Sequence, residues 1–285
     1  MEMLLAVAIG DAYGAGFEFI PHETLHAGND GLAYRQNVRW RDVRPGNYTD
    51  DTCLTVALAE FLVSNTPWTH ANLADAFYNA YARDPRPGFA PGFRGILSSI
   101  SSGREFLERI LPHSDASGSA MRVSPMGMLG TAREVIDGAT WQASLTHASA
   151  QGIAAAQAAA LAVFGAREGI VAWGGVGRWL NSLVPGYNWD APVTSRIPNK
   201  GVPVVRAAVQ ALVAGPSLTG VLCAAVAPGG DVDTCAAIAM SIAASMPDAV
   251  DDLVPVLRDD LEDGKYGRSY IVELDAALRT WAGGR

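Results

Sequence analysis

Cysteine, basic residues and long apolar runs are all scarce in this chain of 285 residues. Its three cysteines (Cys53, Cys223 and Cys235) match neither a disulfide framework nor the ligand spacing of a zinc finger, which fits a reducing compartment. Lys and Arg number 21 against 29 Asp and Glu. The resulting net charge of −8 argues against a protein that mainly binds nucleic-acid phosphates.

No stretch approaches the roughly 20 apolar residues that a membrane-spanning helix needs. The apolar segment after Met1 lacks the basic flank of a signal peptide, and Asp11 interrupts it. Hydrophobic residues still make up 49% of the chain, too many for a disordered protein. We therefore expect a cytoplasmic globular protein with no membrane partner. We also expect one domain over residues 1–285, because no linker or repeat divides the chain.

Apolar residues recur at helical spacing in several parts of the chain, and alternation of the strand type is nearly absent. The helical segments are residues 53–63, 72–82, 154–164, 204–213, 235–246 and 270–281. Residues 32–40 are the best candidate for a β-hairpin. The acidic stretch 248–263 is interpreted as the solvated face of a further helix. The pattern predicts a mostly α fold.

Two segments place acidic and hydroxyl side chains at the start of an apolar helix. These are Thr49–Thr52 and Gly229–Thr234. Taken separately, each is explained by helix capping, since Thr and Asp are favoured at helix N-termini. Taken together, they offer four carboxylates, which would repel one another unless cations lay between them. The alternative to capping is thus a binuclear site for Mg²⁺ or Mn²⁺.

Three further segments are ambiguous when each stands alone. In residues 9–18, glycines and lone acids fit either helix packing or a site. Residues 117–127 are rich in small and hydroxyl side chains, which fits a phosphate-binding loop or a plain turn. His147, in a Thr-His pair, fits a structural or a functional histidine.

In this order, the five segments resemble the ADP-ribosylglycohydrolase family, which includes the hydrolase of ADP-ribosylated dinitrogenase reductase and the ADP-ribosylarginine and ADP-ribosylserine hydrolases. The resemblance is carried by Gly10-Asp11 with Glu18, Thr49–Thr52, Ser117–Arg122, Thr146-His147 and Gly229–Thr234. It implies an all-α, single-domain orthogonal helical bundle with two Mg²⁺ or Mn²⁺ ions in a central cleft.

The resemblance also implies roles for individual residues. The metal ligands would be Thr49, Asp50, Asp51, Asp231, Asp233 and Thr234. Glu18 would stand beside the ions as the acid most closely tied to catalysis, with Asp51 as the other candidate to take a proton from the attacking water. The diphosphate and ribose would lie along Ser114, Gly118, Ser119 and Met121, with His147 near the phosphates.

The implied reaction is metal-dependent hydrolysis of the glycosidic bond between ADP-ribose and an acceptor. The first expectation for the acceptor is an arginine side chain of a mono-ADP-ribosylated protein. The alternatives are free or nucleic-acid-linked ADP-ribose derivatives, or a sensor that binds ADP-ribose without turnover. Ala116-Ser117 stand where family members commonly carry Gly-Asn, so we expect an intact metal site and an altered substrate pocket. Four aromatic residues of nearby loops either stack on adenine or are packed: Phe89, Phe93, Tyr187 and Trp189.

Overall fold

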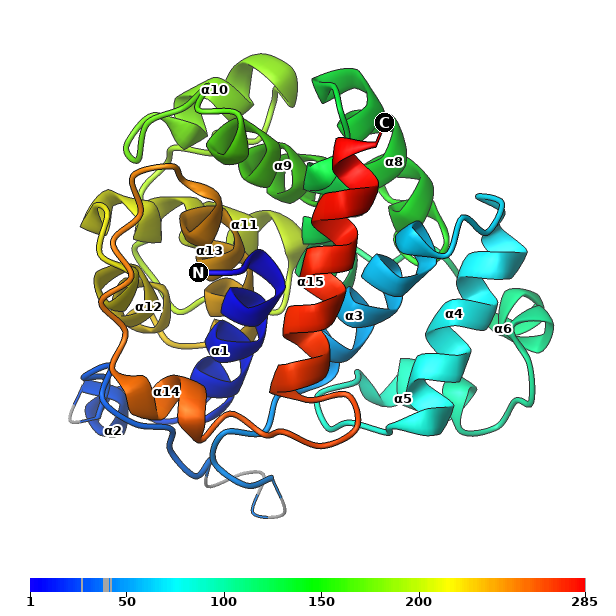
Figure 1. Ribbon diagram of the computed structural model, residues 1–285, viewed down its shortest axis with the longest axis horizontal. Coiled ribbons are helices and arrows are strands. Elements are labelled where there is room, and N and C mark those ends of the chain that lie inside the picture. The colour runs from blue at the N-terminus through cyan, green and yellow to red at the C-terminus, as the bar shows by residue number, and fades with distance from the viewer. Residues whose placement is uncertain (27, 38–40, 42, 285) are drawn as a thin grey trace.

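The computed structural model of the chain describes residues 1–26, 28–37, 41 and 43–284, and in these residues it contains helices and no strand (Figure 1). The predicted all-α class is therefore confirmed. Of the expected hairpin, residues 32–37 form bends and extended coil. Residues 38–40 lie outside the described part of the chain.

Each of the six segments with helical periodicity corresponds to a helix. The helices are α1 (Met3–Ala15), α2 (His22–His26), α3 (Asp50–Val63), α4 (His70–Arg83), α5 (Pro91–Leu97), α6 (Gly103–Arg109), α7 (Gly118–Met121), α8 (Ala132–Ser144), α9 (Ala150–Arg167), α10 (Val176–Leu183), α11 (Gly201–Ala211), α12 (Leu218–Val226), α13 (Val232–Ser245), α14 (Pro255–Asp259) and α15 (Arg268–Gly283), with 3₁₀ turns η1 (Ser124–Met128) and η2 (Leu212–Ala214). The segment at 204–213 changes from α11 into η2 at residue 212.

The centre of the molecule is the pair α1 and α13, flanked by α3, α9 and α15 (Figure 1). Every residue of α1 is buried. Two glycines let the two helices approach closely: an added Cβ would lie 2.5 Å from the carbonyl oxygen of Ala236 at Gly10, and 2.5 Å from Cα of Asp233 at Gly14. The glycines of α1 therefore serve helix packing, and that packing brings the start of α13 beside the end of α1.

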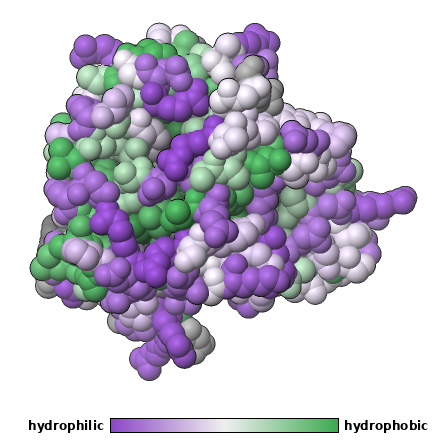
Figure 2. All heavy atoms as spheres, in the orientation of Figure 1, coloured by the Kyte–Doolittle hydropathy of each residue, from purple (hydrophilic) through white to green (hydrophobic). Residues whose placement is uncertain are grey.

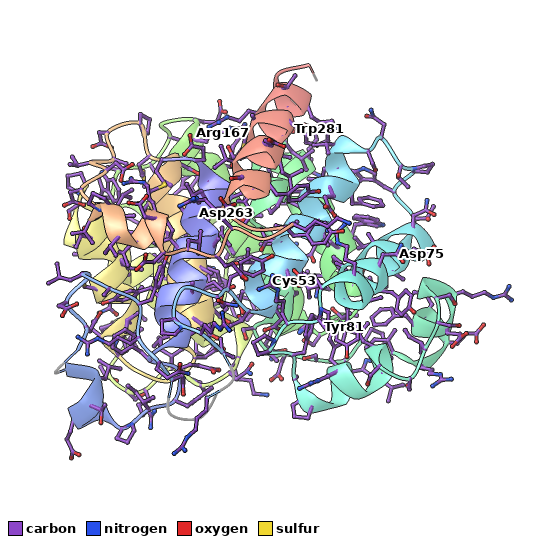
Figure 3. All side chains as sticks on the ribbon, turned by 60° about the horizontal axis from the view of Figure 1, so that its bottom comes forward. Cys53, Asp75, Tyr81, Arg167, Asp263 and Trp281 are labelled. Atoms are coloured by element: carbon purple, nitrogen blue, oxygen red, sulfur yellow. The ribbon has the colours of Figure 1, made fainter. Side chains whose placement is uncertain are left out.

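A second group of helices, α4, α5 and α6, forms one side of the molecule (Figures 1 and 3). Asp75 of α4 accepts a hydrogen bond from the N–H of Gly103 at the start of α6, at 2.8 Å. Tyr81 of α4 meets Phe89 edge-on, with ring centroids 5.4 Å apart. These contacts fix the segment that will form an apolar wall of the site.

The expected helix over residues 248–263 is wrong for most of its length, because only α14 is helical there. The acids instead bind backbone and side-chain donors of other segments. Asp252 accepts hydrogen bonds from the hydroxyl of Ser217 and the N–H of Thr219, and so caps α12. Glu262 accepts the N–H of Tyr48 at 3.1 Å. Contacts with partners so distant in the sequence produce no periodic pattern in the local sequence.

Over the face shown in Figure 2, polar and apolar residues are intermixed. Among the helices of the described chain, none is both long enough and apolar enough to cross a bilayer.

Candidate active site

The ends of three central helices meet at one cavity of about 380 Å³. Glu18 follows α1, Asp50 and Asp51 open α3, and Asp231 and Asp233 lie at the start of α13. We call these five residues the acidic cluster. Two helix starts that are far apart in the sequence are thus brought together, which the alternative of a shared metal site requires and helix capping does not.

Carboxylate oxygens at the cavity form two groups whose members are close enough to share a metal ion. One group of oxygens, from Asp11, Asp51 and Asp233, lies within 4.8 Å. A second group, from Glu18, Asp231 and Asp233, meets the same limit. Asp233 belongs to both groups and therefore stands at the centre.

The electrostatics of the cluster favour proton or cation binding. Burial raises the pKa values of Asp50, Asp51 and Asp233 well above the usual range. Neighbouring carboxylates raise them further, chiefly Asp11 in the case of Asp50 and Asp51, and Glu18 in the case of Asp233. Burial also raises the pKa of Asp231.

The donor set fits hard divalent cations. All of the side-chain donors are oxygens, which Mg²⁺ and Mn²⁺ prefer. Oδ1 of Asp51 is buried and has no hydrogen-bond partner among the described residues. A buried carboxylate oxygen without a donor is destabilising unless a ligand satisfies it.

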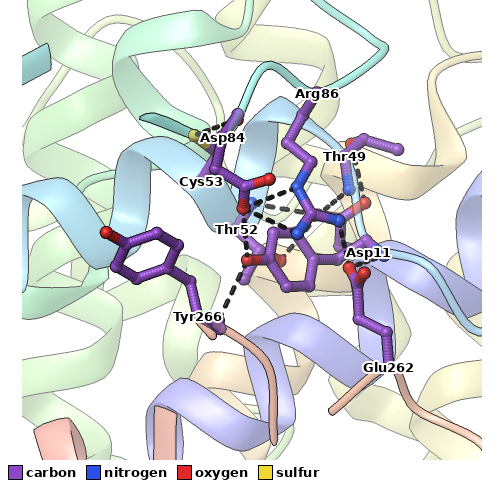
Figure 4. A network of polar contacts seen from close by, with 9 residues as sticks. Asp11, Thr49, Thr52, Cys53, Asp84, Arg86, Glu262 and Tyr266 are labelled. Carbon is purple, nitrogen blue, oxygen red and sulfur yellow. Dashed lines mark hydrogen bonds and ion pairs between the residues drawn. The ribbon is translucent and has the colours of Figure 1, made fainter. Parts of the chain in front are cut away.

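Asp11 lies beneath the cluster, and sequence reasoning gave it no role. It is fully buried and accepts four hydrogen bonds, two from Thr49 and two from Thr52 (Figure 4). The N–H distances are 2.9 Å and the hydroxyl distances are 2.7 and 2.6 Å. Asp11 thus ties α1 to the first turn of α3 and orients Asp50 and Asp51. Its signal in the sequence is a lone acid inside an apolar helix.

The loop before α13 depends on two glycines with positive φ, Gly229 (69°) and Gly230 (99°). A Cβ at Gly230 would lie 2.0 Å from the carbonyl oxygen of Ile197. That carbonyl accepts the N–H of Asp231 at 3.0 Å, which fixes the acid at the cavity. The two glycines therefore form a tight turn that places Asp231 at the cavity.

Ser117, which stands where an Asn is common in the family that the motifs resemble, contacts the acidic cluster directly. Its hydroxyl lies within donating distance of Oδ2 of Asp231 (2.9 Å) and of Oδ1 of Asn199 (3.0 Å). Asn199 also lines the cavity and was not singled out from the sequence. The only signal in the sequence is its place directly after a stretch rich in Gly and Pro, residues 174–198.

The other expected site residues lie at or just beneath the cavity. Those in its lining are Ser114, Gly118, Met121, His147 and Thr234. Thr49 and Ser119 are not in the lining: the Thr49 hydroxyl donates to Asp11, and the Ser119 hydroxyl donates to the carbonyl of Gly152. Their roles stay predictions.

Opposite the acidic cluster, the cavity has an apolar wall. It is formed by Leu54, Ala90, Phe93, Ile96, Ile110 and Leu111. Of the four candidate aromatic residues, Phe93 lies in this wall, and Phe89 is buried behind it at 5.8 Å between ring centroids. Trp189 and Tyr187 pack against each other outside this lining, and the indole N–H of Trp189 donates to the carbonyl of Val184.

On the other side of the α3 start lies a set of compensated charges, the Arg86 network. It consists of Asp84, Arg86 and Glu262 (Figure 4), together with Tyr48, which stacks on Arg86. Arg86 pairs with Asp84 at 2.6 Å and with Glu262, and its guanidinium lies 4.0 Å from the ring centroid of Tyr48. Burial raises the pKa of Glu262, and Arg86 opposes that shift.

The Arg86 network holds the loop that covers Asp50. The carbonyl of Pro87 accepts the N–H of Asp50 at 3.1 Å. Gly88 has a φ of 99°, and a Cβ there would lie 1.9 Å from Oδ1 of Asp50. The loop can therefore pass over the carboxylate only because position 88 is glycine.

Comparison with known proteins identifies the family of the chain. A family model described as ADP-ribosylglycohydrolase matches residues 1–279. The ADP-ribosylhydrolase ARH3 of Mus musculus is 28% identical over 182 residues, which cover 59% of this chain and 48% of that protein. The ADP-ribosylarginine hydrolase Tri1 of Pseudomonas putida (strain GB-1) is 28% identical over 156 residues, which cover 51% of this chain and 39% of that protein. The aligned part thus spans about half the length of the first of these relatives, and less of the second.

A solved structure described as an ADP-ribosylglycohydrolase-related protein complex has a TM-score of 0.73 and 21% sequence identity. The alignment covers 99% of this chain and 96% of that one. At this identity the likeness shows a shared fold.

Proposed function

Because the chain belongs to the ADP-ribosylglycohydrolase family, we propose that it hydrolyses the glycosidic bond between ADP-ribose and an acceptor. The observation that carries the proposal is the acidic cluster, in which carboxylates from three helix ends share one cavity. The names of the two relatives support an ADP-ribosylated substrate, and the second supports arginine as the acceptor. We take an arginine side chain of a modified protein as the first substrate to test.

Two divalent cations, Mg²⁺ or Mn²⁺, fit the oxygen donors at the bottom of the cavity. The residues that would hold them are Thr49, Asp50, Asp51, Asp231, Asp233 and Thr234. When bound, such cations orient ribose hydroxyls and lower the pKa of a water molecule. The buried Oδ1 of Asp51, which lacks a donor among the described residues, supports this assignment.

Two roles remain to be assigned, that of the base and that of a metal ligand, and Glu18 and Asp51 are the candidates. Asp51 is 2% exposed and lies with Asp11 and Asp233, which suits a ligand held in place. Glu18 is 8% exposed and lines the cavity, which suits a base that accepts a proton from the attacking water. The transition state at the anomeric carbon is oxocarbenium-like.

The remaining residues of the cavity would bind the rest of the ligand. Ser114, Gly118, Met121 and His147 would contact the diphosphate and ribose, and Ser119 would hold Gly118 and its neighbours from beneath. The net charge of −8 supports a protein or small molecule, rather than nucleic acid, as the carrier of ADP-ribose. The low cysteine content supports the cytoplasm, and one continuous hydrophobic core supports a single domain.

The test is release of ADP-ribose from peptides that carry ADP-ribosyl-arginine or ADP-ribosyl-serine, with Mg²⁺, with Mn²⁺ and after chelation. We expect metal-dependent release from the arginine substrate and its loss in Glu18→Gln. Release from serine alone would replace arginine as the acceptor. Metal-dependent binding of ADP-ribose without release from either peptide would favour a sensor, and release that persists unchanged in EDTA would refute the metal site.

A further inference from the structure

Behind His147 lies a short chain of hydrogen bonds that the proposed reaction does not use. Nη2 of Arg122 donates to Oγ1 of Thr146 at 2.8 Å. Oγ1 of Thr146 in turn lies 2.6 Å from Nδ1 of His147. All three side chains are buried. We call this chain the Arg122–Thr146–His147 relay.

The direction of each hydrogen bond follows from counting protons. A guanidinium only donates, so the Thr146 oxygen is the acceptor from Arg122. The Thr146 side chain is buried, at 2% exposure, and its hydroxyl has these two partners among the described residues. If Nδ1 carried a proton, the hydroxyl proton of Thr146 would have no acceptor, which a buried group avoids. Thr146 therefore donates to Nδ1, and a neutral ring carries its proton on Nε2.

Nε2 of His147 is left open toward the cavity. His147 is in the cavity lining, and Nε2 has no hydrogen-bond partner among the described residues. A Cβ added at Gly118 would lie 3.0 Å from Cε1 and 3.2 Å from Nε2 of the ring. Glycine at position 118 therefore keeps the ring edge accessible to a ligand.

The inner end of the relay is held rigidly. Nε of Arg122 donates to Oε1 of Gln142 at 2.9 Å, and Nε2 of Gln142 donates to the carbonyl of Ser119 at 2.9 Å. The guanidinium also lies 4.5 Å from the ring centroid of Phe77. Burial and the nearby Arg122 lower the pKa of His147 to about 3, which agrees with a neutral ring.

We propose that Arg122 and Thr146 are positioning residues that hold His147 in the neutral tautomer protonated at Nε2, so that the ring donates this N–H to a phosphate oxygen of the bound ligand. The identity of the ligand as ADP-ribose rests on the proposed function. The tautomer itself is a property of the ligand-free protein. The neutral ring of His147 can donate its Nε2–H to the phosphate without changing its own protonation state.

The first test is the ¹⁵N–¹H spectrum of protein labelled at histidine and loaded with Mg²⁺, which is diamagnetic. Comparison with His147→Gln assigns the signals of His147. We expect an unprotonated Nδ1 and a protonated Nε2, and we expect ADP-ribose, but not adenosine, to shift the Nε2–H signal. A ring protonated at Nδ1, or an Nε2–H signal that ADP-ribose leaves unchanged, would overturn the proposal.

Variants at position 146 separate the relay from general packing. Thr146→Ser keeps the hydroxyl, and Thr146→Val keeps the shape without it. We expect Thr146→Val to weaken ADP-ribose binding about tenfold, to leave adenosine binding within about twofold and to raise KM more than it lowers kcat. Thr146→Ser should bind ADP-ribose within about twofold of the wild type. An equal loss for adenosine would indicate a packing role and contradict the relay.

A matched control uses another threonine that is remote from the cavity lining. Thr140 of α8 donates to the carbonyl of Ile136 and accepts from Gln157, and Thr140→Val should leave both affinities unchanged. If Thr146→Val does not fold, the wild-type spectrum decides. If no peptide is hydrolysed while the tautomer and the ADP-ribose shift are as expected, the proposed function fails and the relay stands.

Discussion

Two groups of acids flank the start of α3, one half-buried and one buried, and they differ in how their charge is balanced. In the Arg86 network, Asp84 and Glu262 face a guanidinium. In the acidic cluster, the aspartates Asp50, Asp51, Asp231 and Asp233 form no salt bridge within the described part of the chain. Arg122, a cation in the same cavity lining, directs its hydrogen bonds to Gln142 and Thr146 instead.

The difference separates charge that serves the fold from charge that serves binding. An acid paired internally is stabilised whether or not a ligand is present, and loss of its partner destabilises the protein. Acids that repel one another raise the free energy of the ligand-free fold and are relieved only by protons or cations. Such uncompensated burial is typical of functional sites.

We expect the largest loss of activity from a substitution in the acidic cluster, whose aspartates form no salt bridge with another described residue. Asp233→Asn keeps the shape of the side chain at the centre of the cluster but removes its charge. We expect ADP-ribose release to fall by about 1,000-fold or more, because both groups of ligand oxygens include Asp233. Without metal, the free energy of unfolding should rise, since repulsion is reduced. Near wild-type turnover with metal bound would show that the reaction takes place elsewhere. Asp137→Asn, at an exposed residue of α8, is the control for turnover.

The second effect falls on the loop that joins the two regions. In Gly88→Ala, the Cβ would meet Oδ1 of Asp50 at 1.9 Å, at a backbone φ of 99°. We expect turnover to fall about 100-fold and stability by about 1–2 kcal/mol, because the loop and Asp50 must separate. Gly95→Ala in α5 is the matched control, since its Cβ would meet nothing within 4 Å. Equal turnover of the two variants would show that the loop does not position Asp50.

The sequence predicted one of the two regions far better than the other. The acidic cluster corresponds to short motifs, because a helix start carries several of its acids in consecutive positions, as at Asp50 and Asp51. The Arg86 network joins Arg86 to Glu262 across 176 residues, and no local pattern records such a pair. For the same reason, the acidic stretch at 248–263 was interpreted as a helix face when its acids bind distant segments.

Much of the fold was predictable, because helical periodicity is a local property of the chain. The helices α3, α4, α9 and α15 contain their predicted segments entirely. What could not be predicted is which buried polar residues support the site from beneath. Asp11 is the example: its partners Thr49 and Thr52 become visible only once α1 and α3 lie side by side.

The third prediction concerns the Arg86 network, in which the charges are paired. Arg86→Met leaves Asp84 and Glu262 without their cation. We expect a loss of about 2 kcal/mol in the free energy of unfolding, measured with urea, and a smaller than tenfold loss of turnover through the Pro87–Gly88 segment. The double variant Arg86→Met with Glu262→Gln should recover part of the stability, because one uncompensated charge is removed. If the losses of unfolding free energy in Arg86→Met and in Glu262→Gln simply add in the double variant, Arg86 and Glu262 do not stabilise each other.

The smallest effect is a pH dependence that distinguishes the two regions in one measurement. An acid whose pKa is raised by folding binds more protons in the folded than in the unfolded state, between its usual value of 3.8 and its folded value. Across that window the stability contributed by the cluster therefore falls as the pH rises. In EDTA, we expect Asp233→Asn to gain about 1 kcal/mol relative to the wild type between pH 5 and pH 7. Saturating Mg²⁺ should abolish that relative gain, since cations replace protons. A stability difference that is constant with pH in EDTA would mean that the cluster is already compensated within the chain.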